Sequence, residues 1–120
     1  MILADTSVWI EYLRSKDADF AVMVSERRIA MHELVIGELA CGTLPERGRS
    51  LDNFRELPRL STTQDREVGF FIEQYRLWGR GLGIVDVHLL VSAALSGARL
   101  WTHDVRLHHA AEELEIAFAR

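Results

Sequence analysis

Short apolar segments alternate with longer amphipathic segments along the whole chain, and this alternation constrains the fold more than any other feature of the sequence. Two strands that are separated by a helix cannot form a hairpin, so a crossover connection joins them and they run parallel. Such crossovers are right-handed and place helices on the faces of the sheet. The sequence therefore predicts an α/β fold, a three-layer α/β/α sandwich with a mainly parallel sheet.

Residues that start or stop helices set the expected boundaries. Pro45 is expected to begin one helix and Pro58 to end it, because proline is tolerated in a first turn and blocks continuation. Thr6 or Ser7 is expected to cap the first helix, and Thr63 the longest. The predicted strands are Ile2–Ala4, Arg28–Met31, Arg59–Ser61, Arg99–Trp101 and Ile116–Phe118. The predicted helices are the segment that holds Val8, Trp9, Tyr12 and Leu13, then Phe20–Glu26, Glu33–Cys41, Pro45–Leu57, Gln64–Trp78, Ile84–Leu95 and Val105–Leu114.

Length and charge indicate one globular domain over residues 1–120. The chain has 14 basic and 18 acidic residues, which gives a net charge of −4. No apolar run approaches the ~20 residues of a membrane span, and no basic region precedes the first apolar segment. The single cysteine, Cys41, excludes an internal disulfide and fits a reducing compartment. We therefore expect a cytoplasmic protein without a membrane anchor.

The distribution of lysine excludes several nucleotide and phosphate chemistries. Lys16 is the only lysine, and it lies in a polar segment near the start of the chain. A P-loop needs a lysine within a Gly-Lys-Ser/Thr step, which the chain lacks. A phospho-accepting receiver domain needs a lysine late in the chain, and a Schiff-base enzyme needs one in its site. None of these classes fits the sequence.

Four carboxylates occupy positions that are unusual for solvated acids. Asp5 and Asp104 directly follow predicted strands, at the edge of the sheet where ligands bind in open α/β folds. Glu38 and Cys41 share the apolar stripe of their helix, so both are expected in the interior, and Asp86 is flanked by leucines on another helix. Helix capping or an arginine partner is an alternative explanation for Asp5, Asp86 and Asp104. Capping does not explain Glu38, which lies in the middle of its helix.

If these four acids converge, they need a cation. Two carboxylates about 4 Å apart repel each other by ~4 kcal/mol at an effective dielectric constant near 20. Carboxylate oxygens without thiolates suit a hard ion that stays partly hydrated, which indicates Mg²⁺ or Mn²⁺. Such an ion supports in-line displacement at phosphorus. The acids therefore predict nuclease chemistry.

Four segments, in order and over essentially the whole chain, resemble the PIN-domain ribonucleases and specifically the VapC-type toxins of toxin–antitoxin pairs. The matching segments are Ile2-Leu3-Ala4-Asp5-Thr6-Ser7-Val8-Trp9-Ile10, Gly37-Glu38-Leu39-Ala40-Cys41-Gly42, Gly81-Leu82-Gly83-Ile84-Val85-Asp86-Val87-His88-Leu89-Leu90 and Leu100-Trp101-Thr102-His103-Asp104. The resemblance implies a PIN-like fold and a metal-dependent endoribonuclease. It assigns catalysis and metal binding to the same four acids, with Thr6 and Thr102 as hydroxyls in the site.

The resemblance also implies partners. RNA is the expected substrate, and Arg80 and Arg106 are the candidate phosphate contacts because they lie nearest in sequence to the acids, although a surface salt bridge would equally explain each. His103 is a further candidate for RNA contact or proton transfer, or a solvated loop residue. A VapB-type antitoxin is expected in an apolar groove, and the protein is expected to form a homodimer. The candidate groove residues, which a core would also explain, are Trp9, Tyr12, Leu13, Phe20 and Met23.

Alternative readings of the same residues stay open. A metal-dependent phosphatase also uses acids at strand ends, but it normally carries a second acid two residues after the first, where this chain has Ser7. A catalytically inactive PIN-like interaction module would share the fold and is expected to lack some of the acids. His103, His108 and His109 could form a zinc cluster, although the adjacent pair points in different directions on a helix.

Overall fold

The computed structural model describes residues 1–120 and has a three-stranded parallel sheet at its centre, in the order β2-β1-β3. Ile2 of β1 lies opposite Ile29 of β2 on one side and Arg99 of β3 on the other. Single parallel bridges from Met31 to Arg59 and from Leu100 to Ala117 continue the sheet at both edges. The two outer predicted strands are thus reduced to one bridging residue each. The strands are β1 (Ile2–Ala4), β2 (Ile29–Ala30) and β3 (Arg99–Trp101).

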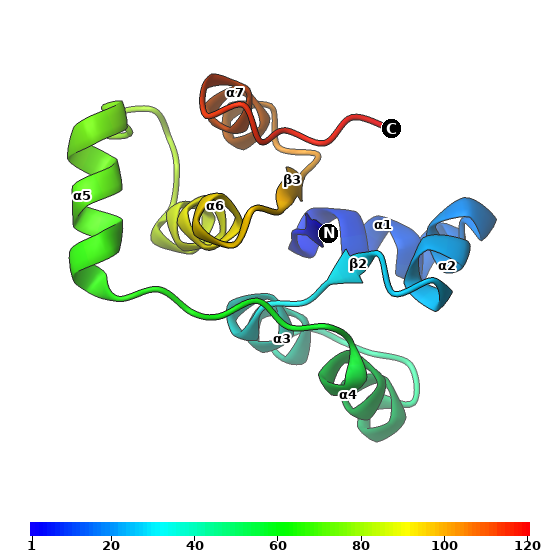
Figure 1. The fold of residues 1–120 in the computed structure, drawn as a ribbon. Coiled ribbons are helices and arrows are strands. Elements are labelled where there is room, and N and C mark those ends of the chain that lie inside the picture. Colours follow the sequence, from blue (N-terminus) through cyan, green and yellow to red (C-terminus); the bar gives the residue numbers. More distant parts are fainter.

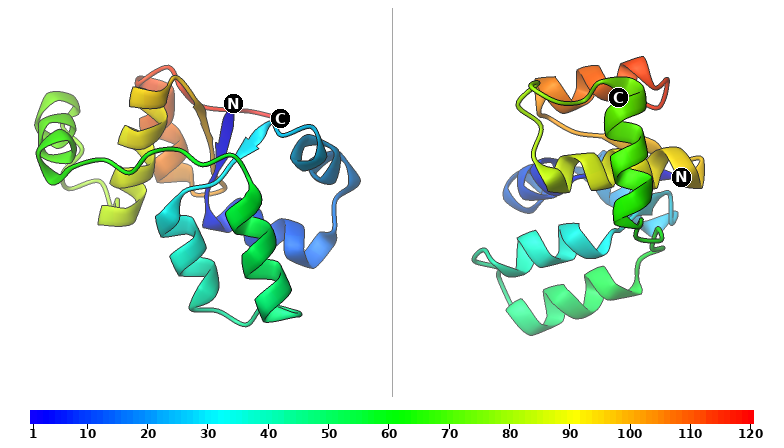
Figure 2. Two further views of the ribbon diagram at one scale, coloured as in Figure 1. Left: turned by 60° about the horizontal axis from the view of Figure 1, so that its bottom comes forward. Right: turned by 90° about the vertical axis from the view of Figure 1, so that its left-hand side faces the viewer.

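Seven helices surround these strands (Figure 1). Helices α1 to α4 gather on one side and α6 and α7 on the other, while α5 stands outside α6 (Figures 1 and 2). The predicted three-layer α/β/α sandwich with a parallel sheet is confirmed. The helices are α1 (Thr6–Ser15), α2 (Ala18–Ser25), α3 (Glu33–Ala40), α4 (Arg47–Glu56), α5 (Asp65–Tyr75), α6 (Ile84–Ser96) and α7 (Val105–Glu113).

The core is formed by the strands and the inner faces of the helices. Leu3, Ile29 and Leu100, one from each strand, are fully buried, and they belong to a cluster of 25 buried apolar residues. Helix α6 contributes the longest run of buried side chains, from Leu89 to Ala93. Strands that are buried on both faces hold their backbones rigidly, so the residues that follow them have fixed positions.

The start of α1 differs from the prediction. Asp5 caps this helix, and its Oδ1 accepts a hydrogen bond of 3.1 Å from the Val8 N–H. Thr6 and Ser7, which were predicted to be caps, lie inside the helix, and the Ser7 hydroxyl donates to Asp5 Oδ1 at 2.5 Å. The prediction was wrong because an ionised carboxylate is a stronger acceptor for the free N–H groups than a hydroxyl, which here serves as a donor.

The prolines and the predicted Thr63 cap also give different boundaries. Helix α4 begins at Arg47, two residues after Pro45, and Pro58 follows its end as expected. Gln64 rather than Thr63 caps α5, and its N–H donates to Glu67 Oε1 at 2.8 Å. Helix α5 stops at Tyr75 because the next residue turns left-handed, so α6, with 13 residues, is the longest helix.

Candidate active site

Asp5 lies at the carboxyl end of the central strand and is buried. Its backbone N–H donates to the Trp101 carbonyl at 3.0 Å, which continues the pairing of β1 with β3 beyond the last strand residue. The side chain accepts hydrogen bonds from Val8 and Ser7 through the same oxygen, Oδ1. No hydrogen bond or ion pair engages the other oxygen, Oδ2, so half of this carboxylate keeps its capacity as an acceptor.

The loop after β3 is joined to the start of α1 through Ser7. The Ser7 Oγ donates to Asp5 and accepts a hydrogen bond of 3.0 Å from the His103 backbone N–H. Buried Thr102 accepts from the Asp104 N–H at 3.0 Å, which fixes the turn between the strand and α7. Asp104 in turn caps α7 by accepting from the N–H of Arg106 at 2.9 Å. Asp5 and Asp104 are thus both held at the carboxyl-terminal edge of the sheet, where the strands end.

Glu38 approaches this edge from α3. Its Oε1 accepts a hydrogen bond of 2.5 Å from the Thr6 hydroxyl, next to Asp5 in the chain. The prediction that Glu38 and Cys41 face the interior is wrong, because both residues are exposed and the buried face of α3 is formed by Val35, Ile36 and Leu39. The apolar residues before and after Glu38 in the sequence indicated a buried face that is wider than the one the structure shows.

Asp86 lies in the first turn of α6, directly after the glycine loop formed by residues 79–83. Its Oδ2 accepts a hydrogen bond of 3.0 Å from the Gly83 N–H in the first turn of the helix. Two residues earlier, Gly81 has a φ of +76°, and an added Cβ there would lie 2.5 Å from Arg106 Nη1. The Arg106 Nε is 3.6 Å from Asp104 Oδ1. Arg106 therefore lies between the loop that leads to Asp86 and the acid that follows β3.

The four acids all use at least one oxygen in a local hydrogen bond, to a backbone N–H or to a hydroxyl. No group of three or more His, Cys, Asp or Glu side chains is arranged so that it could hold a metal ion. This observation also covers the alternative zinc cluster of His103, His108 and His109. The structure therefore does not assemble the four predicted acids into one ion-binding cluster. Their carboxylate oxygens are nevertheless the ligand type of hard divalent ions.

The candidate RNA contacts differ in how free their side chains are. Arg80 is half-buried and forms a two-pronged ion pair with Glu113 of α7, at 2.9 and 3.1 Å. This contact lowers the pKa of the Glu113 carboxyl, because the guanidinium stabilises its charged form. His103 is exposed, with its ring edge-on to Trp101, and Arg106 is exposed. Arg80 therefore links the glycine loop to α7, and a salt bridge explains its position, as the alternative to RNA contact stated.

Sequence reasoning missed the bridging role of Ser7. Ser7 was considered only as a helix cap and as the residue that stands where a phosphatase would carry its second acid. Its hydroxyl in fact joins the start of α1 to the loop after β3. A hydroxyl two residues after an acid at a strand end is the signal that would have suggested this, because Ser hydroxyls bond backbone and carboxylate groups at that spacing. Of the candidate groove residues, Trp9 and Phe20 are buried in the core, and Tyr12, Leu13 and Met23 are partly buried against it.

Comparison with known proteins gives consistent results. The family described as PIN domain matches residues 2–113. Two proteins named Ribonuclease VapC32, from Mycobacterium tuberculosis strains CDC 1551 / Oshkosh and ATCC 25618 / H37Rv, are each 47% identical over 120 residues, covering 99% of this chain and 97% of theirs. The crystal structure of PAE2754 from Pyrobaculum aerophilum has a similar fold, with a TM-score of 0.67 and 22% identity over 98% of this chain and 87% of that one.

These results agree with the resemblance inferred from the sequence. None of the helices is long and apolar enough to cross a membrane. The matched family covers almost the whole chain, and the VapC relatives align with it over nearly their full length. The chain belongs to the PIN-domain family and, within it, to the VapC type.

Proposed function

We propose that this protein is a metal-dependent endoribonuclease and the toxin of a VapBC-type toxin–antitoxin pair, acting in the cytoplasm. The observation that carries the proposal is the shared edge of the sheet, where Asp5 and Asp104 follow adjacent parallel strands and Ser7 joins their loops. The relatives named Ribonuclease VapC32 support the same activity. Carboxylates at such an edge suit phosphodiester hydrolysis because they can hold the cation that would offset the negative charge developing at phosphorus.

The cofactor that we propose is Mg²⁺ or Mn²⁺. The donors fit such an ion in kind, because they are oxygens and because Asp5 Oδ2 is free of hydrogen bonds. A bound ion would neutralise the carboxylates and supply the positive charge that polarises a phosphate. The residues proposed to hold it are Asp5, Glu38, Asp86 and Asp104.

The side chains around these acids have separate tasks. Thr6 and Ser7 orient the carboxylates of Glu38 and Asp5, since each hydroxyl donates directly to one of them. Thr102 fixes the turn that presents the acid at the start of α7. The exposed Arg106 guanidinium lies at the rim of the same edge and is suited to bind a phosphate of the RNA.

The antitoxin site that we propose is a cleft beside Glu38. It has a volume of about 360 Å³ and lies between α1 and the end of α3, with Leu13, Leu39 and Leu44 in its walls. An apolar segment that binds there would pass directly beside one of the acids. Inhibition by a VapB-type antitoxin would then follow from occupation of a groove that is continuous with the active site.

We further propose that the protein is a homodimer. Helices α5 and α6 and the loop between them expose large apolar side chains that a monomer would leave in water, which is typical of an interface. Sedimentation velocity is expected to show a dimer, and a Phe70→Glu variant is expected to shift it toward monomer. Purely monomeric wild-type protein would contradict the proposal. The exposed side chains are Phe70, Tyr75, Trp78, Ile84 and Leu95.

Cleavage of a panel of single-stranded and structured RNAs tests the activity. The wild type with added Mg²⁺ or Mn²⁺ is compared with Asp86→Asn and with an EDTA control. The amide of the variant still has an oxygen for the Gly83 N–H, so the start of α6 is expected to stay intact. We expect cleavage that needs both the ion and Asp86. Folded protein that neither cleaves RNA nor binds metal would instead support an inactive interaction module.

A further inference from the structure

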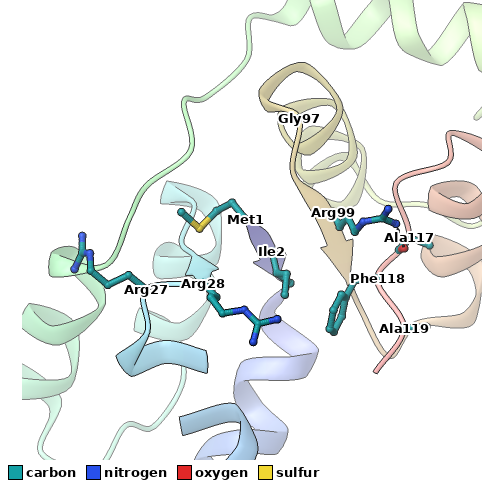
Figure 3. Close-up of a pocket in the computed structure, with 9 residues that line it drawn as sticks. All are labelled: Met1, Ile2, Arg27, Arg28, Gly97, Arg99, Ala117, Phe118 and Ala119. Carbon is teal, nitrogen blue, oxygen red and sulfur yellow. Dashed lines mark hydrogen bonds between the residues drawn. The ribbon is translucent and has the colours of Figure 1, made fainter. Parts of the chain in front are cut away.

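A second charged cleft lies at the opposite ends of the strands (Figure 3). It has a volume of about 570 Å³ and is formed by the start of β1, the turn before β2, the start of β3 and residues 117–119. Asp5 and Asp104 follow the strands, whereas this cleft is at the ends where the strands begin. No acidic residue lines it.

Three arginines line this cleft, namely Arg27, Arg28 and Arg99. Arg28 has one loose ion pair with exposed Glu26 at 3.7 Å, and neither of the other two forms an ion pair. Arg99 donates to the Ala117 carbonyl at 3.3 Å, which leaves most of its guanidinium donors unused. Each of the four other main clefts contains a single arginine. Positive charge with little compensation is therefore concentrated in this cleft.

An aromatic ring accompanies these arginines. Phe118 lines the cleft and is held against Trp101, with 5.0 Å between the ring centroids. In Figure 3 the Arg28 side chain extends toward Ile2 and Phe118, Arg99 points to Ala117, and Arg27 points outward at the rim. A groove that combines cationic side chains with a fixed aromatic ring suits a single-stranded nucleic acid, because phosphates pair with the cations while a base stacks on the ring.

We propose that this arginine cleft binds single-stranded RNA at a second site. It is separate from the acidic edge, the end of the sheet where Asp5 and Asp104 lie. The inference rests on the proposed ribonuclease function and adds to it a means of holding the substrate. A chain with a net charge of −4 and a proposed active site of carboxylates repels RNA at long range. Three arginines whose single ion pair is the loose one between Arg28 and Glu26 supply the local positive potential that RNA binding needs.

The two sites are close enough for one RNA strand to reach both. The strands contain at most three residues, so the end of the sheet where the strands begin and the end where they finish are only about 10 Å apart. An RNA of several nucleotides that is bound at the acids is therefore long enough to reach the arginine cleft. Long substrates are expected to bind more tightly than short ones for this reason.

RNA binding measured without divalent ions tests the proposal. A fluorescein-labelled single-stranded RNA of about 16 nucleotides, the upper end of single-domain site sizes, is titrated in EDTA at several salt concentrations. The test variant is Arg27→Gln/Arg28→Gln, which leaves the Arg99 contact with Ala117 in place. The matched control is Arg49→Gln/Arg55→Gln on α4, which removes the same charge from two exposed arginines with loose ion pairs.

We expect the cleft variant to bind RNA more weakly and the control to bind like the wild type. The slope of log K against log salt is negative, and it should become about 1.4 less steep in the cleft variant, because each lost contact with a single strand contributes about 0.7. Equal effects in both variants would show a general charge effect and overturn the proposal. Wild-type protein that neither binds nor cleaves RNA would instead refute the ribonuclease function on which it rests.

Photocrosslinking of the wild type provides a second measurement that does not depend on a variant. RNA that contains 4-thiouridine is crosslinked in EDTA, and the attachment sites are mapped by mass spectrometry. We expect crosslinks at Phe118 and its neighbours in addition to any at the acidic edge. Crosslinks confined to the acidic edge would overturn the second site and leave the ribonuclease proposal intact.

Discussion

The hydroxyl of Thr6 donates a hydrogen bond of 2.5 Å to the carboxylate of Glu38, and this contact joins the first turn of α1 to the exposed face of α3. The two residues are 32 positions apart in the sequence. Glu38 lies on a solvent-facing surface, where a glutamate side chain ordinarily samples several rotamers. The contact with Thr6 therefore selects the orientation that directs Glu38 to the edge of the sheet.

Replacement of Thr6 by valine should reduce RNA cleavage while the fold is retained. Valine keeps the branched shape but cannot donate to Glu38. If Glu38 is a metal ligand as proposed, the loss of a residue that orients it should cost about 10 to 100-fold in activity or affinity. Thr6→Ser keeps the hydroxyl and should stay near wild-type activity. Cleavage rates over a range of Mg²⁺ concentrations test this, and equal rates for the valine and serine variants would contradict the orienting role.

The glycine loop allows a matched comparison of two substitutions. Gly79→Ala and Gly81→Ala both place a side chain at positive φ, at a cost of about 1 to 2 kcal/mol each, but only Gly81 is approached by Arg106. Because the Arg106 side chain is flexible and exposed, it can move away, and the two variants should be destabilised to a similar extent. Gly81→Ala should, however, weaken RNA binding more than Gly79→Ala, because it displaces Arg106. Urea denaturation and RNA titration measure the two effects. The difference in RNA binding should disappear in an Arg106→Ala background, and its persistence there would contradict the role of Arg106.

The sequence was informative about the strands and the two acids that follow them. Strands β1 and β3 have the predicted bounds, because short apolar runs between polar helices leave little freedom of assignment. Asp5 and Asp104 are placed directly by those strands. Their role as helix caps could also be read from the sequence, since acids are favoured before a first turn.

Features that depend on contacts between distant segments could not be predicted from the sequence. The exposure of Glu38 is set by which face of α3 packs against α1 and α4, and the apolar neighbours in sequence do not reveal it. The Arg80 ion pair joins residues 33 positions apart, so nothing local in the sequence predicts its partner. The outer strands shrank to single bridges because edge strands are weakly specified by their own sequence.

Buried His32 should make the fold less stable in mild acid. Burial lowers the pKa of this imidazole from 6.5, and nearby His88 lowers it further while Glu33 opposes the shift. The unfolded chain therefore takes up a proton near pH 6.5 before the folded one does. Stability should be constant above pH 6.5 and fall below it, by at most about 1.4 kcal/mol per pH unit, until the folded pKa is reached.

The His32→Asn variant is the control for this prediction. His32 Nδ1 accepts a hydrogen bond from the Leu34 N–H at 3.0 Å at the start of α3, and asparagine can supply an equivalent acceptor. The variant should lose the decline of stability that His32 causes, whatever its absolute stability. Urea denaturation at several pH values between neutral and mildly acidic measures the slope, and identical slopes in both proteins would contradict the assignment.

Asp17 and Arg120 should give a second, more acidic loss of stability. Arg120 donates two hydrogen bonds to the Asp17 carboxylate, and this contact lowers the pKa of Asp17 from 3.8 to about 2. Because the folded pKa is depressed, the contribution is present above pH 3.8 and is lost as the pH falls toward 2. Asp17→Asn keeps an acceptor for the cap of α2 and should flatten this part of the profile. Asp19→Asn, which removes a weaker contact at 3.3 Å, should flatten it less, and the reverse order in acid denaturation would show that Asp17 is not the titrating group.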